Sequence, residues 1–255
     1  MILVFCDTFD LPALWAAGRL AARGIAVDVV TAQVLESALQ WRHTIAADGD
    51  AHVAIELADG RRISSDSPAA VLNRLSQVPR ARVDHVGGDD RDYAAQEMGA
   101  LFLSWLEAMP GPLVNRPTPQ GLSGRWRHPS QWAVLAARAG LAVAPYRQSH
   151  ETDPDRAWLS DPRPDAVAVF AVSETAIAPA AIPEPVRQGC LRLAQEAGEA
   201  LLGIDLVPGR DGAWLMVGAS PNPDLMRGGE PLIDALARLL IAGEGSPARA
   251  EALAG

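Results

Sequence analysis

Residues 1–31, which read MILVFCDTFDLPALWAAGRLAARGIAVDVVT, contain the pattern that indicates the fold class. Two apolar runs, 2–6 and 26–31, enclose a stretch with apolar residues at helical spacing. Strand, helix and strand in this order form the unit from which parallel sheets are built. We therefore expect a βαβ opening and a mostly parallel sheet, which places the chain in the α/β class. The helical stripe consists of Leu11, Leu14, Trp15 and Leu20.

The next segments indicate a hairpin, a further strand and a long helix. The dipeptide Asp59-Gly60 separates the segments 52–57 and 62–63, which is typical of a β-hairpin. A strand is expected at 69–72. A helix is expected from about 92 to 108, because a Pro-Gly-Pro sequence follows and ends it.

Composition changes after a short expected strand at 112–117, where a loop rich in proline and glycine begins. We therefore predict an α/β domain at 1–116, a second domain of α+β type at 117–242, and a flexible tail at 243–255. In the second domain, helices are expected at 129–139, 184–201 and 231–240, and strands at 143–146, 167–172, 175–177, 202–207 and 213–217.

Composition also excludes several classes of function. The chain has no lysine, so a Schiff base or a P-loop lysine is excluded, and its 22 basic residues are all arginines. The net charge of -9 and the scattered arginines argue against a nucleic-acid partner. No apolar run reaches the roughly 18 residues of a membrane span. Cys6 and Cys190 lie outside any CxxC pair, which is typical of buried thiols in a cytoplasmic protein.

Two catalytic signatures are missing. The sequence has neither a Gly-x-Ser-x-Gly elbow nor a Gly-x-Gly-x-x-Gly loop after the first strand. This argues against a serine hydrolase and against a dinucleotide site. His128, beside Trp126 and Pro129, is interpreted as a helix cap, with a role as a base as the alternative.

An ordered set of short motifs resembles one known family, the ATP-grasp ligases of the ribosomal-protein-S6-modification and graspetide type. These enzymes join a carboxylate to an amine through an acyl-phosphate. The resemblance covers most of the chain and implies a parallel pre-ATP-grasp sheet followed by an ATP-grasp-like domain. The motifs are Val-Leu-Asn-Arg at 71–74, Leu-Val-Asn-Arg-Pro at 113–117, Ala-Gly-Leu-Ala-Val-Ala-Pro at 139–145, Gly-Ile-Asp-Leu-Val at 203–207, Asp-Gly-Ala-Trp at 211–214 and Ser-Pro-Asn-Pro at 220–223.

The resemblance also implies a nucleotide site that this chain has largely lost. Family members hold the phosphates with two lysines on strands of a central subdomain. Here the interval between Tyr146 and Gly203 is shortened to a loop rich in proline and one expected strand pair. The phosphate cradle is therefore expected to be deleted rather than substituted.

The expected metal ligands are also incomplete. Asp205 matches the family's first ligand, but Gly218 and Ser220 replace the expected Glu and Asn. Magnesium prefers several oxygen ligands in near-octahedral geometry, so these residues make a poor site. Asn222 supplies an amide only through a shift of two residues. The alternative for Asp205 is an ion pair with one of the arginines.

The family's substrate cleft suggests further candidates for binding a substrate or partner. Arg74 and Arg116 end strands whose carboxyl ends should face that cleft, and ion pairs are the alternative for both. The complete set of candidates is Asn73, Arg74, Arg116, Arg147 and Asn222.

These observations favour a non-catalytic ATP-grasp-like protein, a pseudo-ligase, that binds a peptide, a small molecule or a protein partner. No cofactor is expected under this hypothesis. The alternative is an active carboxylate-amine ligase in which arginines replace the lysines, and this alternative requires ATP and magnesium. A shortened centre exposes apolar surface, so we expect a homo-oligomer or an interaction surface. The tryptophans proposed for that surface are Trp126, Trp132 and Trp158.

Overall fold

The chain forms two compact units in the computed structural model, which describes residues 1–47, 49, 51–65, 68, 70–78, 87, 90–109, 111–146, 165–209 and 212–242. The first unit consists of Met1–Arg125 with the residues from Leu236 onward, and the second consists of Trp126–Ala235. The domain boundary at residue 116 stays a prediction. The tail predicted at 243–255 lies outside the described residues.

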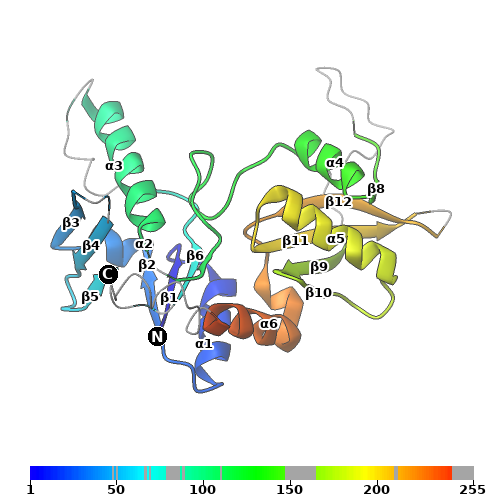
Figure 1. Ribbon diagram of the computed structural model, residues 1–255, viewed down its shortest axis with the longest axis horizontal. Coiled ribbons are helices and arrows are strands. Elements are labelled where there is room, and N and C mark those ends of the chain that lie inside the picture. The colour runs from blue at the N-terminus through cyan, green and yellow to red at the C-terminus, as the bar shows by residue number, and fades with distance from the viewer. Residues whose placement is uncertain are drawn as a thin grey trace. The chain divides into compact units, whose positions relative to one another are not determined.

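The first unit contains a four-stranded parallel sheet with strand order β2-β1-β6-β7 (Figure 1). The helix α1 (Leu11–Ala21) connects β1 (Ile2–Cys6) to β2 (Val27–Thr31). All five residues of β1 are buried, as expected for a central parallel strand that is covered on both faces. The predicted βαβ opening and parallel sheet are confirmed. The other two strands are β6 (Ala70–Arg74) and β7 (Leu113–Val114).

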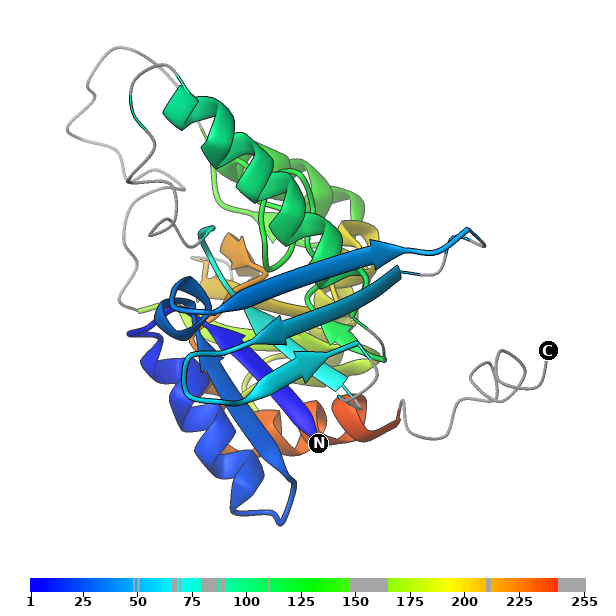
Figure 2. The ribbon, with the colours of Figure 1, turned by 90° about the vertical axis from the view of Figure 1, so that its left-hand side faces the viewer.

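A second, antiparallel sheet in this unit has the strand order β3-β4-β5. Figure 2 shows its strands side by side, from blue to cyan. The predicted hairpin is β4 (Ala51–Glu56) and β5 (Arg62–Ser64). The edge strand β3 (Gln40–Ile45) and the short helix α2 (Ala32–Glu36) were not predicted. Four of the six β3 residues are exposed, so its sequence lacks the apolar alternation by which a strand is recognised.

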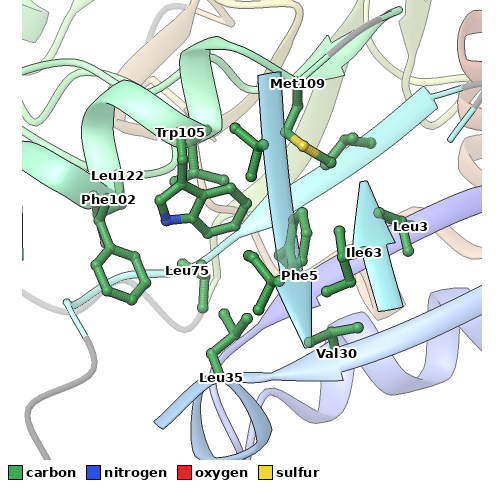
Figure 3. Packing of buried hydrophobic residues seen from close by; sticks show 14 of the residues in the cluster. Leu3, Phe5, Val30, Leu35, Ile63, Leu75, Phe102, Trp105, Met109 and Leu122 are labelled. Atoms are coloured by element: carbon green, nitrogen blue, oxygen red, sulfur yellow. The ribbon is translucent and has the colours of Figure 1, made fainter. Parts of the chain in front are cut away.

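The helix α3 (Asp90–Glu107) closes the core between these two sheets with aromatic side chains. Figure 3 shows Trp105 between Phe102 and Phe5. The ring centroid of Trp105 lies 5.2 Å from that of Phe5 and 5.8 Å from that of Phe102, both in edge-to-face arrangements. This geometry suits the charge distribution of aromatic rings.

The second unit is built on a five-stranded sheet with strand order β10-β9-β11-β12-β8. Neighbouring strands are antiparallel except β12 and β8, which are parallel. The predicted strand pair and the α+β character of this half of the chain are confirmed. The strands are β8 (Ala142–Val143), β9 (Val167–Val172), β10 (Thr175–Ile177), β11 (Leu201–Pro208) and β12 (Trp214–Ser220).

Two helices, α4 (Pro129–Arg138) and α5 (Glu184–Ala197), pack on one face of this sheet, and Figure 1 shows α5 in yellow along the strands. Gly189 allows close approach, since a Cβ there would lie 2.5 Å from a Leu141 methyl carbon. After β12 the chain forms the short 3-10 helix η1 (Leu225–Gly228) and the helix α6 (Gly229–Ala242), and the division between the units falls within α6.

Candidate functional site

The residue matched to the family's metal ligand, Asp205, lies near the middle of the second unit's sheet. Asp205 pairs in the sheet register with Gly218 on β12 and with Ala168 on β9. The register of β11 and β12 shifts between Asp205 and Leu206, and such irregularities change where a side chain points. A Cβ added to Gly218 would have Asp205 Oδ2 at 4.0 Å as its nearest neighbour. The position of Gly218, where the family pattern has a second carboxylate, therefore has room for a side chain beside Asp205.

Asp205 forms an ion pair with Arg227 of η1. Arg227 Nη1 donates to Asp205 Oδ1 over 2.9 Å, and Arg227 Nη2 donates to the Ala166 carbonyl over 2.9 Å. Both charged side chains are about two-fifths exposed. The interpretation of Asp205 as the partner of an arginine matches this geometry.

The remaining residues of the expected metal set are Ser220 and Asn222. The Asn222 backbone N–H donates to Ser220 Oγ over 3.1 Å, and Asn222 Oδ1 is buried without a hydrogen-bond partner among the described residues. The adjoining Pro223 packs on Gly203, where an added Cβ would lie only 2.4 Å from Pro223 Cβ. The chain therefore turns closely over β11 just after Ser220.

These four positions do not fit the magnesium site that the family resemblance implies. The one carboxylate, Asp205, is already neutralised by Arg227, and Gly218 offers no oxygen from a side chain. Within the described residues, no three His, Cys, Asp or Glu side chains come together as metal ligands would. No lysine is present in the chain to hold phosphates. No chemical step through a metal-bound nucleotide can be derived from these residues.

A cavity of about 500 Å³ lies next to the ion pair, within the second unit. Ala168 and Phe170 project into it from β9, whereas Val169 and Ala171 belong to the core under α4 and α5. Side chains alternate along a strand, so the cavity lies on the opposite face of the sheet from these helices. Its lining comprises Ala166, Val167, Ala168, Phe170, Ile177, Ala178, Pro179, Arg227, Gly228 and Pro231.

The candidate Asn73 has a structural role within the first unit. Its side-chain amide donates to the carbonyls of Asn115 over 3.1 Å and Leu122 over 2.6 Å. Its Oδ1 accepts from the Leu75 N–H over 3.3 Å. Asn73 is 2% exposed, so these bonds satisfy a buried amide and connect β6 to the segment after β7.

The candidate Arg74, at the carboxyl end of β6, forms a buried ion pair with Asp10. Arg74 Nε donates to Asp10 Oδ2 over 2.7 Å, and both side chains are at most 10% exposed. Asp10 Oδ1 also accepts from the Ala13 N–H over 3.0 Å and so caps α1. The alternative of an ion pair for Arg74 matches this arrangement.

The other arginine candidates are less informative. Arg116 forms an exposed ion pair with Glu107 over 2.9 Å. Arg147 lies outside the described residues. Asn73, Arg74 and Arg116 belong to the first unit, and Asp205 and Asn222 belong to the second.

His128 caps α4, as the sequence predicted. Its side-chain Nδ1 accepts from the Ser130 backbone N–H over 3.3 Å, and its backbone N–H donates to Gln131 Oε1 over 2.9 Å. Of the tryptophans proposed for a surface, Trp126 is 64% exposed and Trp132 is buried. Trp158 lies outside the described residues.

The two cysteines are buried free thiols, one in each unit. Burial, assisted by the nearby Asp10 carboxylate, raises the pKa of Cys6 to about 11. Burial alone raises the pKa of Cys190 to about 12. Both are therefore protonated and poor nucleophiles at neutral pH. None of the helices in the described ranges is long and apolar enough to cross a membrane.

Sequence reasoning missed Arg227 and Asp10, the partners of two candidate residues. Arg227 carried a signal, since it is the one basic residue between Asp211 and Ala237. A carboxylate on a strand can pair with an arginine from a nearby segment, and a lone arginine is the first candidate. Asp10 stands just before an apolar helical stripe, where an acidic residue predicts an N-cap.

No family model and no curated protein matches the sequence, but solved structures match nearly the whole chain. The macrocyclase MdnC from Microcystis aeruginosa MRC, bound with the precursor peptide MdnA, has a TM-score of 0.66 at 13% identity over 94% of this chain and 99% of that one. A RiPP-associated ATP-grasp ligase from Chryseobacterium gregarium, in complex with ADP and a leader and core peptide, has a TM-score of 0.66 at 10% identity over 94% of this chain and 96% of that one. The ATP-grasp ligase PsnB, complexed with minimal precursor, Mg and ADP, has a TM-score of 0.63 at 19% identity over 96% of this chain and 98% of that one.

At sequence identities of 10–19%, these structural similarities establish the fold alone. The parallel sheet of the first unit and the mixed sheet of the second agree with the architecture that the sequence motifs implied. The chain has an ATP-grasp-like fold.

Proposed function

We propose that this chain is a ligase-like protein that binds a peptide and does not catalyse ATP-dependent ligation. The observation that carries the proposal is the ion pair between Asp205 and Arg227. A guanidinium at this carboxylate supplies the positive charge that a metal would otherwise bring. Magnesium would have to displace it and would find no second carboxylate at Gly218.

The peptide part of the proposal is supported by the similar structures. MdnC, the Chryseobacterium gregarium ligase and PsnB were each solved with a precursor, leader or core peptide. A chain with the same fold that has lost its phosphate-binding lysines can still keep a peptide-binding surface. The buried free thiols of Cys6 and Cys190 agree with a reducing compartment, which we propose is the cytoplasm.

A turnover assay tests the catalytic part of the proposal. Purified full-length chain is incubated with ATP, magnesium and a panel of carboxylate and amine acceptors, and ADP release is measured. We expect no release above the background without protein. Release that depends on an acceptor and disappears in Asp205→Ala would show an active ligase in which arginines replace the lysines.

A peptide-display screen tests the binding part. Full-length chain is immobilised and challenged with a library of random peptides, and selected peptides are measured again in solution by calorimetry. Saturable binding of a defined peptide class is expected. A screen in which no selected peptide binds in solution would contradict peptide recognition.

A further inference from the structure

We infer that the cavity beside Arg227 binds a molecule that carries a carboxylate next to an apolar side chain, such as the C-terminal residue of a peptide. This inference rests on the proposed function, because it names the ligand class for the same part of the second unit. It requires no nucleotide, metal or covalent step. The cavity supplies an apolar wall and a positioned cation.

The apolar wall is contributed by two strands and by the start of α6. Ile177 from β10 and Pro231 from α6 supply accessible apolar surface, Phe170 from β9 lies buried beneath it, and small residues such as Ala168 leave the space open. The volume of about 500 Å³ lies within the range of roughly 300–1,000 Å³ that is usual for small-ligand sites. A branched or aromatic side chain with part of its backbone fits this space.

Arg227 is the one charged residue among the described lining residues. Its bonds to Asp205 and to the Ala166 carbonyl fix the guanidinium from the side of the sheet. These contacts with described residues use one N–H of each terminal nitrogen, so further N–H groups remain for a ligand. A guanidinium binds the two oxygens of a carboxylate side by side, which gives both orientation and energy.

The pairing with Asp205 favours a singly charged ligand. A doubly charged phosphate would meet the Asp205 carboxylate with only one guanidinium to compensate, and the chain has no lysine nearby to assist. A carboxylate carries one charge and needs only the free edge of Arg227. Asp205 therefore positions Arg227 but also weakens its attraction for an anion.

The experiment is calorimetric titration of the full-length chain with N-acetyl-leucine and with its uncharged amide, N-acetyl-leucinamide. We expect the acid to bind at least about tenfold more tightly than the amide, because a charge-assisted bond is lost in the amide. Equal affinity of the two compounds, or no binding of the acid, would overturn the inference. Acetyl-Ala-Ala-Leu provides a second arm: tighter binding than N-acetyl-leucine identifies a peptide C-terminus, and equal binding identifies a small free acid.

Three variants separate the parts of the site. Arg227→Gln should remove the preference for the acid, and Ala168→Phe should fill the cavity and abolish binding of both compounds. Asp205→Asn should strengthen acid binding by about threefold or more, because it removes the competing negative charge. Weaker acid binding in Asp205→Asn, with an unchanged melting temperature, would contradict the role given to Arg227.

Arg61→Gln is the matched control, since it removes a partly exposed arginine of the first unit that, like Arg227, binds an aspartate and a backbone carbonyl, and it should leave binding unchanged. The failure of this inference is distinct from the failure of the proposed function. Magnesium-dependent ATP turnover would overturn the proposed function, whereas equal binding of acid and amide would overturn only the ligand class.

Discussion

At the scale of single residues, two ion pairs differ in burial, and burial determines what each contributes to stability. Asp10 and Arg74 are almost fully buried, whereas Asp205 pairs with Arg227 near the surface. Removal of one partner from a buried pair leaves an uncompensated charge in a medium of low dielectric constant. Exposed pairs contribute little, because water and salt screen them.

We therefore expect Asp10→Ala to lower the free energy of unfolding by roughly 3–5 kcal/mol, since it removes the buried carboxylate that pairs with Arg74 and also removes the cap of α1. Asp205→Ala should lower the free energy of unfolding by less than about 1 kcal/mol. Urea denaturation monitored by circular dichroism measures both. Glu107→Ala is the control for an exposed pair, and an equal loss in all three variants would contradict the assignment.

The metal site should be recoverable by substitution. The double variant Gly218→Glu, Arg227→Ala would have two carboxylates, those of Asp205 and the new glutamate, on adjacent strands and no guanidinium beside them. Manganese titration followed by electron paramagnetic resonance should show a bound ion in the double variant and none in the parent chain. Manganese binding of similar affinity in the parent would contradict the view that Arg227 replaces the metal.

Sequence reasoning performed unevenly at this scale. The match of Asp205 to a metal-ligand position, with Gly218 and Ser220 in place of its partners, came from the order of the family motifs and stays a prediction. Whether Arg74 and Asp205 bind ligands or arginines did not follow, because the partners come from segments distant in the chain. Asp10 is 64 residues away from Arg74, and Arg227 is 22 residues away from Asp205. Such contacts depend on the tertiary fold.

At the scale of elements, α3 illustrates how one side chain joins two sheets. Trp105 packs against Phe5 of β1, Phe102 of its own helix and Trp41 of β3. Its indole Nε1 is buried without a hydrogen-bond partner among the described residues. The aromatic surface therefore stabilises the core, while the buried donor costs free energy.

The stabilising ring contacts and the unpaired indole N–H predict different losses in the free energy of unfolding for two substitutions of Trp105. Trp105→Ala should lower the free energy of unfolding by roughly 3–5 kcal/mol. Trp105→Phe should cost less than about 1.5 kcal/mol, because it keeps most ring contacts and removes the unpaired donor. Guanidinium denaturation of both variants measures the difference. Similar losses for Phe and Ala would show that the indole N–H has a partner.

The expected and observed elements agree where local patterns are strong. The hairpin β4–β5, the long helix α3 and the strand pair β9–β10 were predicted, because turn dipeptides and apolar spacing act over short distances. The edge strand β3 was missed, since its exposed polar residues give no alternating pattern. Its pairing with β4 is a tertiary effect.

At the scale of the whole molecule, Cys6 and Cys190 report separately on the two units. The pKa of each buried thiol lies above its ordinary value of 9.0. A raised pKa in the folded chain means that folding favours the protonated form. The contribution to stability is fully present below pH 9 and is lost as pH rises toward the folded pKa values of about 11 and 12.

We expect neither thiol to react with a disulfide reagent at about pH 8 in the folded chain, and both to react after unfolding. Mass spectrometry of labelled peptides along a urea titration shows which unit opens first. Prompt labelling of Cys6 in native buffer would contradict its burial at the centre of the parallel sheet.

The architecture at this scale was accessible from sequence because the order of weak motifs is itself a long-range signal. No single motif specifies an ATP-grasp-like fold, but their order along the chain agreed with the structure. The residues around 147–164, where the phosphate-binding part was expected to be missing, lie outside the described ranges. The central claim about the nucleotide therefore depends on Asp205, Arg227 and the missing lysines.

The measurement that tests this claim most directly is calorimetric titration of ATP and ADP into the full-length chain, with and without magnesium. The Asp205–Arg227 pair and the absence of lysine predict no magnesium-dependent binding, even at protein concentrations that detect millimolar affinity. Micromolar binding that requires magnesium and is lost in Asp205→Asn would contradict the account and show that this site still holds a metal-bound nucleotide.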